Sequence, residues 1–265
     1  MIKRVKYLLK KYNLAPLHFL SQNFLISKIT IRKMAGYAKK TTLEIGPGLG
    51  FLTEEISKNA DRVIAVEKDR GMVELLNNEY DFKNVELYNE DFLETDLSFD
   101  CCVSSIPYSL SSKIILKLLR TEHEYSILLL QKEYAERVQE ISTRLGVMVN
   151  ALGDIEIIEP VDRKQFYPSP NVDSVIARLT PNKKVRSSFF SSAVRVLFQH
   201  RRKKVKNALI DSRHEVGLSK EEAKNTFSEI VHGQKRVLGL SLEEIEEISE
   251  ELEEIFKSKN QENAV

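Results

Sequence analysis

The sequence lacks most features that mark secreted, membrane-spanning or metal-binding proteins. None of its apolar runs approaches the roughly 20 residues that cross a bilayer. The first ten residues, MIKRVKYLLK, have neither the long apolar segment nor the cleavage site of a signal peptide. Only two cysteines are present, and as neighbours on a strand Cys101 and Cys102 would point to opposite faces, which excludes a disulfide framework and a cysteine metal site. We therefore expect a cytoplasmic protein whose cysteines are buried in its core.

What the sequence does have is a regular alternation of strand and helix patterns. Hydrophobic residues make up 42% of the 265 residues, which suits one large or two modest domains with a proper core. The alternation predicts an α/β fold with a mostly parallel sheet covered on both faces, and ligands then bind outside the carboxyl ends of the strands. The seven predicted strands are the run that begins at residue 41 and residues 62–67, 85–88, 100–105, 125–131, 154–162 and 172–180.

The segment TTLEIGPGLG at residues 41–50 is the centre of this pattern. It is a short apolar run that ends in three glycines at alternate positions, Gly46, Gly48 and Gly50. Such a segment predicts a buried strand that runs into a turn where only glycine lets another molecule approach the backbone, followed by a helix over about residues 51–58. This arrangement is typical of a cradle for a nucleotide-like cofactor.

Acidic residues follow two later strands. Glu67 lies about 20 residues beyond the first glycine, where a parallel nucleotide-binding fold places a carboxylate on the ribose hydroxyls. Asp91 follows the 85–88 strand, where it could accept a hydrogen bond from an adenine amino group while Phe92 packs nearby. Taken alone, Asp91 is more simply an acid in a surface turn. Its register with Glu67 and the glycines favours a binding role.

Details of the glycine turn distinguish between cofactor classes. Dehydrogenases and methyltransferases share a glycine turn, but a dinucleotide fingerprint requires G-x-G-x-x-G, and here Phe51 replaces the last glycine while Pro47 lies inside the loop. The lysine pattern of a phosphate loop is also absent. A cradle without a phosphate clamp, with one acid for ribose and another for adenine, suits S-adenosyl-L-methionine, which carries no phosphate.

Segments outside the sheet indicate two domains. The uncharged stretch 18–27 precedes the cradle, with Ser27 placed to cap a helix that runs to about residue 39. Its Gln22 and Asn23 either cap turns or supply amide groups beside the cofactor. Helical patterns take over after about residue 181. We predict a cofactor-binding domain over residues 1–182, with a mobile or lightly docked basic N-terminal arm, and a small all-helical domain over residues 183–265.

The formal net charge of +1 conceals an uneven distribution. Five Lys or Arg residues fall within the first eleven, and six more, with His200, fall between Arg195 and Lys206. The segment 242–254 carries eight glutamates. Any single run of charge is most simply a solvated helix face. Two basic clusters on either side of a cofactor fold, however, favour a polyanionic partner.

One further motif, SIPY at residues 105–108, is similar to a motif of a known family. Over nearly its whole length the chain resembles the ribosomal RNA adenine N6-dimethyltransferases, which modify two adjacent adenines near the 3′ end of small-subunit ribosomal RNA. The shared motifs, specific when taken together in this order, are QNFL at 22–25, EIGPGLGFLT at 44–53, VE at 66–67, DF at 91–92, IPYSLSS at 106–112, FYPSPNVDS at 166–174 and FQHRRKKVKNAL at 198–209. The part after Phe198 is more similar to archaeal members than to bacterial ones.

The resemblance implies a Rossmann-like class I methyltransferase with a mostly parallel seven-stranded sheet and a small all-helical C-terminal domain. It also implies roles for individual residues. Tyr108 stacks on the target base, and Phe166 lies in the loop expected on the other side of that base. The implied cofactor contacts are Gln22, Asn23 and Leu25 in the N-terminal loop, Gly46 and Gly48 on the methionine side, Glu67 on ribose, Asp91 and Phe92 at adenine, and Ser105.

The helical domain is expected to hold structured RNA. Its cluster of Arg201, Arg202, Lys203 and Lys204 would bind phosphates, with an affinity that falls as salt rises. The expected partner is the small-subunit ribosomal RNA within an immature small ribosomal subunit. We expect a monomer with no membrane partner.

One departure from the family pattern concerns its catalytic motif, N-[IL]-P-[YF]. This chain has Ser105 in place of the asparagine, followed by Ile106, Pro107 and Tyr108. The adenine amino nitrogen is a poor nucleophile, and in the family the asparagine oxygen and the carbonyl of the next residue position it by accepting its N–H groups. A serine hydroxyl can accept as well but is shorter. We expect Ser105 to retain activity at a reduced rate, with water, Ser104 or Ser109 assisting.

Three alternatives remain open at this point. A sister enzyme that methylates adenine in large-subunit RNA would share the cradle and the aromatic motif. A ribosome-assembly factor with weakened catalysis is compatible with Ser105. A nicotinamide dehydrogenase is disfavoured by Phe51 and by the absence of a catalytic His or Tyr-Lys arrangement. No catalytic or metal-ligating spacing, and so no metal site, is found among His18, His123, His200, His214 and His232.

Overall fold

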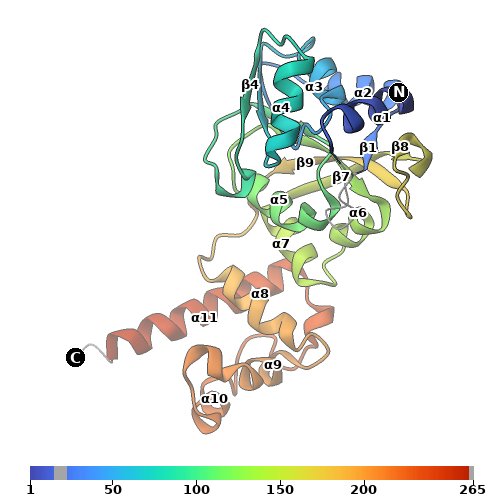
Figure 1. Cartoon of the computed structure of the whole chain (residues 1–265). Coiled ribbons are helices and arrows are strands. Elements are labelled where there is room, and N and C mark those ends of the chain that lie inside the picture. The colour runs from blue at the N-terminus through green and yellow to red at the C-terminus, as the bar shows by residue number, and fades with distance from the viewer. Residues whose placement is uncertain (15–22, 263–265) are drawn as a thin grey trace. The chain divides into compact units, whose positions relative to one another are not determined.

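The computed structural model describes residues 1–14 and 23–262, which divide into two compact units (Figure 1). The first unit consists of residues 1–136 and 154–181, and the second of residues 137–153 and 182–265. The sequence suggested a single division after residue 182. Instead, the segment 137–153 also belongs to the second unit, because helix α7 (Arg144–Leu152) packs against α8 (Phe190–Gln199) and α11 (Leu242–Glu262).

A mostly parallel seven-stranded sheet forms the centre of the first unit, as expected. The spatial order is β4-β3-β2-β5-β6-β9-β7, with parallel pairing from β4 through β6 and antiparallel pairing of β9 with β6. The strands are β2 (Thr41–Ile45), β3 (Arg62–Val66), β4 (Val85–Tyr88), β5 (Cys101–Ser104), β6 (Tyr125–Gln131), β7 (Gly153–Val161) and β9 (Ser174–Pro181).

The strand order changes direction between β2 and β5. From β2 the chain continues to β3 and β4 on one side and then returns to place β5 on the other side of β2. Ligands of open α/β sheets bind at such a switch point, outside the carboxyl ends of the strands. The loops that follow β2, β3 and β5 therefore meet at one edge of the sheet.

The helices of the first unit are amphipathic and bury their apolar stripes on the sheet. One core cluster joins Cys101 and Val103 of β5 to residues of α1 to α4, while Cys102 faces the other side of the strand. Both cysteines are fully buried, as expected. The helices are α1 (Ile2–Lys11), α2 (Lys28–Ala35), α3 (Phe51–Ile56), α4 (Arg70–Glu79), α5 (Ser111–Leu118) and α6 (Lys132–Gln139).

A two-stranded antiparallel sheet was not anticipated from the sequence. It pairs β1 (Phe24–Leu25) with β8 (Phe166–Tyr167), so that Phe24 lies opposite Tyr167 and Leu25 opposite Phe166. The ladder continues where the Ile26 amide donates to the Gln165 carbonyl at 2.8 Å. This small sheet joins the segment before α2 to the loop before β9, and two residues per strand are too few to show a period of two.

The second unit is helical, with α9 (Val205–Asp211) and α10 (Lys220–Thr226) completing the set begun by α7, α8 and α11. Some glutamates of α11 form hydrogen bonds and ion pairs with neighbouring segments. Glu253 accepts from the hydroxyls of Ser187 and Ser188, and Glu244 pairs with Lys235. Short 3₁₀ turns occur at Phe92–Glu94, Tyr108–Leu110, Arg163–Gln165, Arg213–Val216 and Val237–Gly239. None of the described helices is long and apolar enough to cross a membrane.

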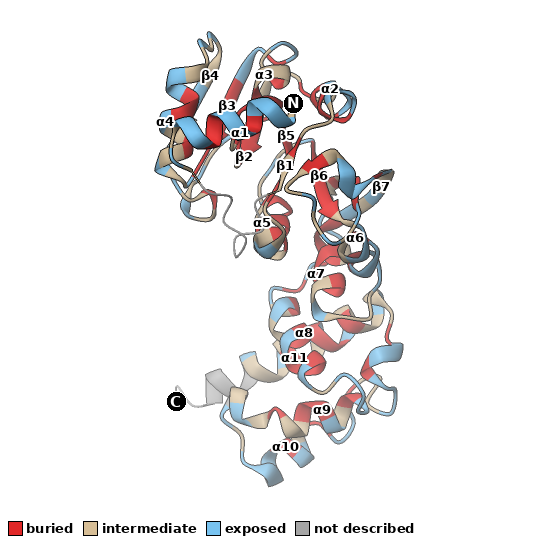
Figure 2. Ribbon diagram, turned by 45° about the vertical axis from the view of Figure 1, so that its right-hand side comes forward, coloured by how far each residue is buried: buried red, intermediate tan, exposed pale blue. Residues whose placement is uncertain are grey.

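Helix α1 is docked firmly, which corrects the expectation of a mobile or lightly docked arm. Its apolar residues Val5, Leu8 and Leu9 are buried in the core cluster of the first unit. Figure 2 shows the alternation of buried and exposed residues along this helix. The basic residues concealed this docking, because a short lysine-rich helix resembles a solvated arm until its apolar stripe has a partner.

Replacing Leu8 with alanine should therefore destabilise the first unit by about 2–5 kcal/mol, since a side chain that is 1% exposed leaves a cavity when it is truncated. Urea denaturation followed by circular dichroism measures the effect. Ile2→Ala on the exposed side of the same helix is the control and should change stability by less than about 0.5 kcal/mol. Equal stability of the two variants would contradict the docking of α1.

Candidate active site

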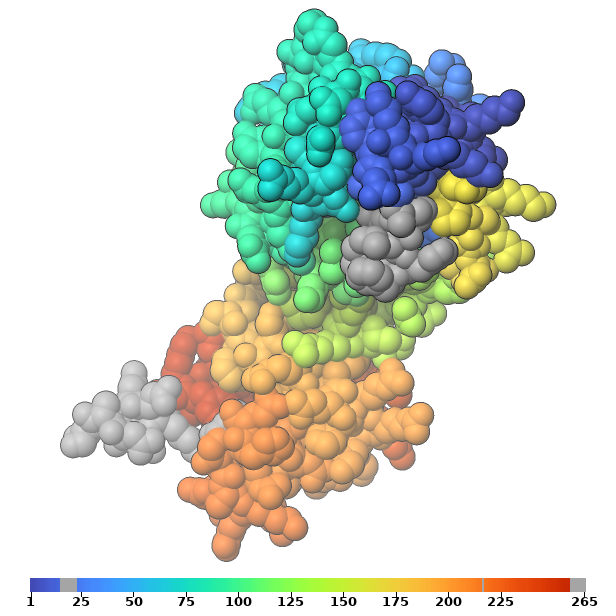
Figure 3. All heavy atoms as spheres, viewed as in Figure 1, coloured from blue at the N-terminus to red at the C-terminus, as the bar shows by residue number. Residues whose placement is uncertain are grey.

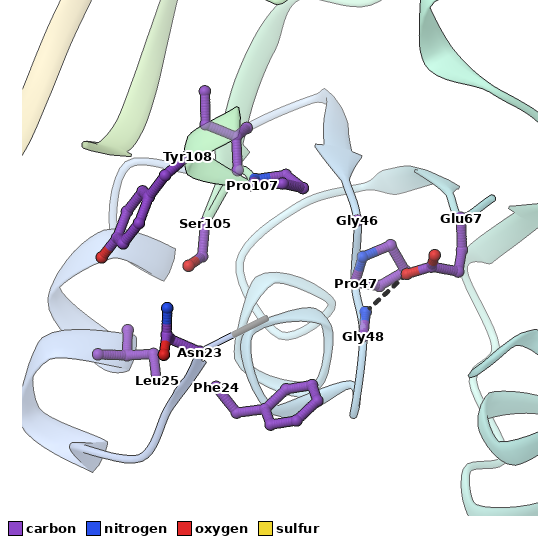
Figure 4. Close-up of a pocket in the computed structure, with 11 residues that line it drawn as sticks. Asn23, Phe24, Leu25, Gly46, Pro47, Gly48, Glu67, Ser105, Pro107 and Tyr108 are labelled. Atoms are coloured by element: carbon purple, nitrogen blue, oxygen red, sulfur yellow. Dashed lines mark hydrogen bonds between the residues drawn. The ribbon is translucent and has the colours of Figure 1, made fainter. Parts of the chain in front are cut away.

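A pocket lies at the switch point, where the loops after β2, β3 and β5 meet β1 (Figure 4). Its walls come from four segments that are distant in sequence but adjacent at one edge of the sheet. The lining residues are Asn23, Phe24, Leu25, Gly46, Pro47, Gly48, Glu67, Ser105, Ile106, Pro107 and Tyr108. Nine of these were predicted from the sequence as site residues, and Phe24 and Pro47 were not.

The glycine cradle has the backbone conformation that the sequence suggested. Gly46, Gly48 and Gly50 all have positive φ angles, of 69°, 55° and 78°. At Gly50 two features exclude a side chain. The positive φ angle disfavours any other residue, and a Cβ would lie 2.7 Å from Leu76 Cδ2. At Gly48 an added Cβ would touch the Phe24 ring at 3.4 Å. The cradle therefore packs against α4 at Gly50, and Phe24 of β1 lies beside Gly48 in the pocket wall.

Glu67 holds the cradle in place. Its carboxylate accepts from the Gly48 amide at 3.1 Å and from the Asp69 amide at 2.9 Å, and the side chain is 8% exposed. Burial raises the pKa of Glu67, while the two amide donors lower it. A carboxylate has about four acceptor positions, so these two bonds leave capacity for hydroxyl donors from the pocket.

The turn after β5 forms the opposite wall. The Tyr108 hydroxyl and the Ser174 Oγ are 2.7 Å apart in a hydrogen bond, which fixes the half-buried ring at the pocket edge. Burial raises the pKa of the Tyr108 phenol, so it stays neutral at physiological pH. Figure 4 shows the Ser105 hydroxyl and the Asn23 side chain pointing toward one another across the pocket.

The structure does not support the assisting role expected of Ser104 or Ser109. Ser104 is fully buried, and its hydroxyl accepts from the Ile45 amide at 2.7 Å, continuing the β2–β5 pairing beyond the last backbone partners. Ser109 is exposed and is not among the lining residues. Of Ser104, Ser105 and Ser109, Ser105 is therefore the serine that lines the pocket.

Three other predicted site residues lie outside the pocket lining. Asp91 pairs with Lys68 at 2.8 Å and accepts from the Leu93 amide, and the Lys68 hydrogen bond lowers the pKa of its carboxyl. Phe92 is buried beneath Lys117, whose Nζ lies 4.6 Å from the ring centroid. Phe166 is 3% exposed in the core behind Leu25, so its ring would have to leave the core to face a base. Gln22 lies outside the described residues.

The two lining residues that were not predicted have recognisable signals. Phe24 lies inside the QNFL motif, between Asn23 and Leu25, and its ring lies beside Gly48 of the cradle. Pro47 lies between two glycines of the cradle itself. Motif positions adjacent to the predicted cofactor-binding residues would have included both.

The basic cluster of the second unit forms a separate cavity. Arg202, Lys203 and Lys204 line it, and Arg236 joins them from a distant segment through a backbone bridge to Lys204. The Arg236 guanidinium donates to the Arg202 carbonyl at 2.8 Å, and Lys203 is paired with Asp211. Arg201 instead donates to the Ser142 carbonyl. No cluster of metal-ligating side chains occurs within residues 1–14 and 23–262.

A second carboxyl group lies behind the cradle. Glu44 of β2 is 1% exposed, and its Oε2 has no hydrogen-bond partner among the described residues. Burial raises the pKa of Glu44 to about 8. Because the folded pKa exceeds that of the unfolded chain, the protonated form favours folding, and this contribution is lost as pH rises from about 4.5 toward 8.

Glu44→Gln should therefore flatten the pH dependence of stability. Between pH 5 and 8 the wild type should lose stability relative to the variant, by at most about 1.4 kcal/mol per pH unit. Urea denaturation of cofactor-free protein at several pH values measures this difference. Glu74→Gln, on the exposed face of α4, should leave the wild-type slope unchanged. Parallel stability curves for wild type and Glu44→Gln would contradict a buried proton at this position.

Comparisons with known proteins identify the family of this chain. The family model for "Ribosomal RNA adenine dimethylase" matches residues 17–254. "Probable ribosomal RNA small subunit methyltransferase A" of Pyrococcus abyssi is 41% identical, covering 96% of this chain and 98% of that protein. The protein of the same name from Methanopyrus kandleri is 36% identical, covering 95% and 98%.

Solved structures confirm the class I methyltransferase fold. A dimethyladenosine transferase from Plasmodium falciparum superimposes with a TM-score of 0.71 and 25% identity over 88% of this chain and 98% of that one. The 23S rRNA methyltransferase ErmE gives a TM-score of 0.61 and 27% identity over 87% and 100%. Because the family model matches residues 17–254 and relatives share about 40% identity over nearly the whole chain, this chain belongs to the ribosomal RNA adenine dimethylase family.

Proposed function

We propose that this protein transfers methyl groups from S-adenosyl-L-methionine to the N6 atoms of two adjacent adenines near the 3′ end of small-subunit ribosomal RNA, during maturation of the small subunit. One observation carries the proposal: the pocket joins a glycine cradle and Glu67 directly to the Ser105–Tyr108 turn. A cofactor wall and a base-binding wall thus share one cavity. The relatives named small subunit methyltransferase A support the choice of RNA.

The cofactor side of the pocket fits S-adenosyl-L-methionine. The positive φ angles at Gly46 and Gly48 let a ligand lie against the bare backbone, and the buried Glu67 carboxylate has acceptor capacity for ribose hydroxyls. Asn23 and Leu25 close the pocket from β1. When bound, the cofactor supplies an electrophilic methyl group. We assign its adenine to the region of Asp91 and Phe92, at the carboxyl end of β4 next to Glu67.

The other wall positions the target adenine. Its amino nitrogen is a weak nucleophile, because the lone pair is delocalised into the ring, and the base must leave its stack to expose that nitrogen. Tyr108, fixed by Ser174, offers an aromatic face worth about 1–3 kcal/mol in base stacking. The Ser105 hydroxyl and the Ile106 carbonyl are the acceptors for the amino N–H groups. Positioning by these residues supplies the catalysis.

Ser105 gives the sharpest test of this arrangement. Ser105→Ala should lower kcat by about 10²–10³-fold, by analogy with loss of one preorganised polar group in an active site. Ser105→Asn, with a longer acceptor, should methylate at least as fast as wild type. Incorporation of labelled methyl groups into immature small subunits measures the rates. Equal rates for wild type and Ser105→Ala would exclude a role for the hydroxyl.

The identity of the substrate needs a direct experiment. Mass spectrometry of RNA fragments, after incubation with S-adenosyl-L-methionine and either immature small subunits or large-subunit RNA, should show two neighbouring dimethyladenines in the small-subunit RNA alone. Methylation of large-subunit RNA instead would contradict the proposed target. An inactive wild type with an active Ser105→Asn variant would favour the second candidate, an assembly factor with weakened catalysis, which the serine itself suggests.

We also propose that the basic cavity of the second unit binds RNA phosphates. Arg202, Lys204 and Arg236 reach it from two segments held together by backbone hydrogen bonds, including Val205 N to Lys235 O at 2.9 Å. A rigid group of cations binds a phosphate chain with less loss of entropy than mobile side chains. Of the four cations predicted to bind RNA, Arg202, Lys203 and Lys204 line this cavity, and Arg201 does not.

Arg202→Gln with Lys204→Gln should weaken binding of the 3′ fragment of small-subunit RNA and make its salt dependence shallower. The slope of log K against log salt should fall in magnitude by about 0.7–0.9 for each phosphate that the variant no longer neutralises. Filter binding at several KCl concentrations measures the slope. Lys220→Gln with Lys224→Gln on the exposed side of α10 removes the same charge and should preserve the wild-type slope. Identical slopes for both pairs would contradict the assignment.

A further inference from the structure

The amino-terminal part of the first unit has a one-sided charge. Residues 1–43 contain ten Lys or Arg residues and neither Asp nor Glu. The first acidic residue is Glu44, which is buried behind the cradle. Any neutralisation of the N-terminal cations must therefore come from acids elsewhere in the fold.

The fold neutralises six of these ten cations. On α1, Arg4 pairs with Glu54 at 3.6 Å and Lys11 pairs with Glu79 at 2.5 Å. The other four are Arg32 with Glu55, Lys33 with Glu159, and Lys39 and Lys40 with Glu124. In the part of the chain that the structure describes, Lys3, Lys6, Lys10 and Lys28 form no ion pair.

Three of the four unpaired lysines share one face of α1. Lys3, Lys6 and Lys10 recur at intervals of three and four residues, which places them on one stripe opposite the buried side chains of the helix. Tyr7 lies within the same stripe and is 57% exposed. Arg4 and Lys11, the paired cations, lie on its flank. We call Lys3, Lys6, Tyr7 and Lys10 the α1 stripe.

The α1 stripe continues to the rim of the active site. Lys6 Nζ lies 5.6 Å from the centroid of the Tyr167 ring, and Tyr167 is the partner of Phe24 in the β1–β8 ladder. Phe24 in turn lines the pocket against the glycine cradle. Figure 3 shows the dark-blue N-terminal segment on the visible face beside the yellow segment that contains β8. All of these residues belong to the first unit.

We propose that the α1 stripe is a docking surface for the phosphate backbone of the substrate RNA next to the target adenine. The inference rests on the proposed function, since it takes RNA to be what enters the pocket. Three unpaired ammonium groups match phosphates, and Tyr7 offers an exposed aromatic face among them for an unstacked nucleotide. RNA is favoured over an acidic protein because the stripe is continuous with a pocket for a nucleobase.

The test compares two triple variants with the same loss of charge. Lys3→Gln, Lys6→Gln and Lys10→Gln remove the stripe. Lys40→Gln, Lys58→Gln and Lys83→Gln are the control, because these exposed lysines lie before β2, after α3 and before β4, at the edge of the sheet opposite the pocket. The probe is the 3′ fragment of small-subunit ribosomal RNA. Its Kd is measured by fluorescence anisotropy over a range of KCl, and methylation kinetics of the fragment are measured in parallel.

The stripe variant should bind the RNA at least about tenfold more weakly, with a salt slope shallower by about 2. Its KM for RNA should rise while kcat stays unchanged. The control variant should have the Kd, salt slope and KM of the wild type. Tyr7→Ser should weaken binding about fivefold or more, while Tyr7→Phe, which keeps the ring, should bind like wild type.

Equal Kd values and slopes for the stripe and control variants would overturn the inference. Unchanged binding of naked RNA, combined with slower methylation of immature subunits, would identify a ribosomal protein as the partner and overturn it too. A wild type that does not methylate, but binds RNA through the stripe, would contradict the proposed function and leave the docking surface standing. The two failures are therefore distinguishable.

Discussion

The parallel pairing of β2 with β3 on one side and β5 on the other is the constraint on which the rest of the molecule depends. It brings the glycine cradle, Glu67 and the Ser105–Tyr108 turn to the same edge of the sheet, although 59 positions separate Ile45 from Ser104, whose hydroxyl accepts from the Ile45 amide. The hydrogen bond from the Gly48 amide to Glu67 then locks two of these loops together. None of these loops forms a pocket alone, and the strand pairing brings them together into one pocket.

Buried polar groups near the carboxyl ends of the strands have two different roles. Ser104 and Glu67 have acceptor positions filled by backbone amides, so they fix the positions of the strands and the cradle. Glu44 instead is buried with one oxygen unpartnered among the described residues, and its raised pKa keeps a proton in the core. The carboxyl group of Glu67 thus holds backbone segments in position, whereas the carboxyl group of Glu44 on the neighbouring strand titrates.

The fold pairs some of the cations with acidic residues and leaves others without acidic partners among the described residues. The acids that neutralise N-terminal cations come from α3, α4 and more distant segments, and they leave one stripe of lysines on α1 without acidic partners among the described residues. In the second unit, α11 glutamates hold neighbouring loops, while Arg202, Lys204 and Arg236 remain around a cavity. Cations without acidic partners are those available to phosphates, because an ion pair must otherwise be broken first.

Elements with local signals could be predicted from the amino-acid sequence. The cradle and the seven strands could be predicted because glycine at positive φ and apolar runs depend on neighbouring residues. Features that depend on partners distant in the chain became visible only in the folded protein. It docked α1 through Leu8, buried Phe166 in the core, diverted Ser104 to the Ile45 amide and joined Arg236 to the basic cluster. An apolar stripe such as that of α1 shows that a helix has a face to bury, but the partner of that face lies in a distant segment and is not encoded locally.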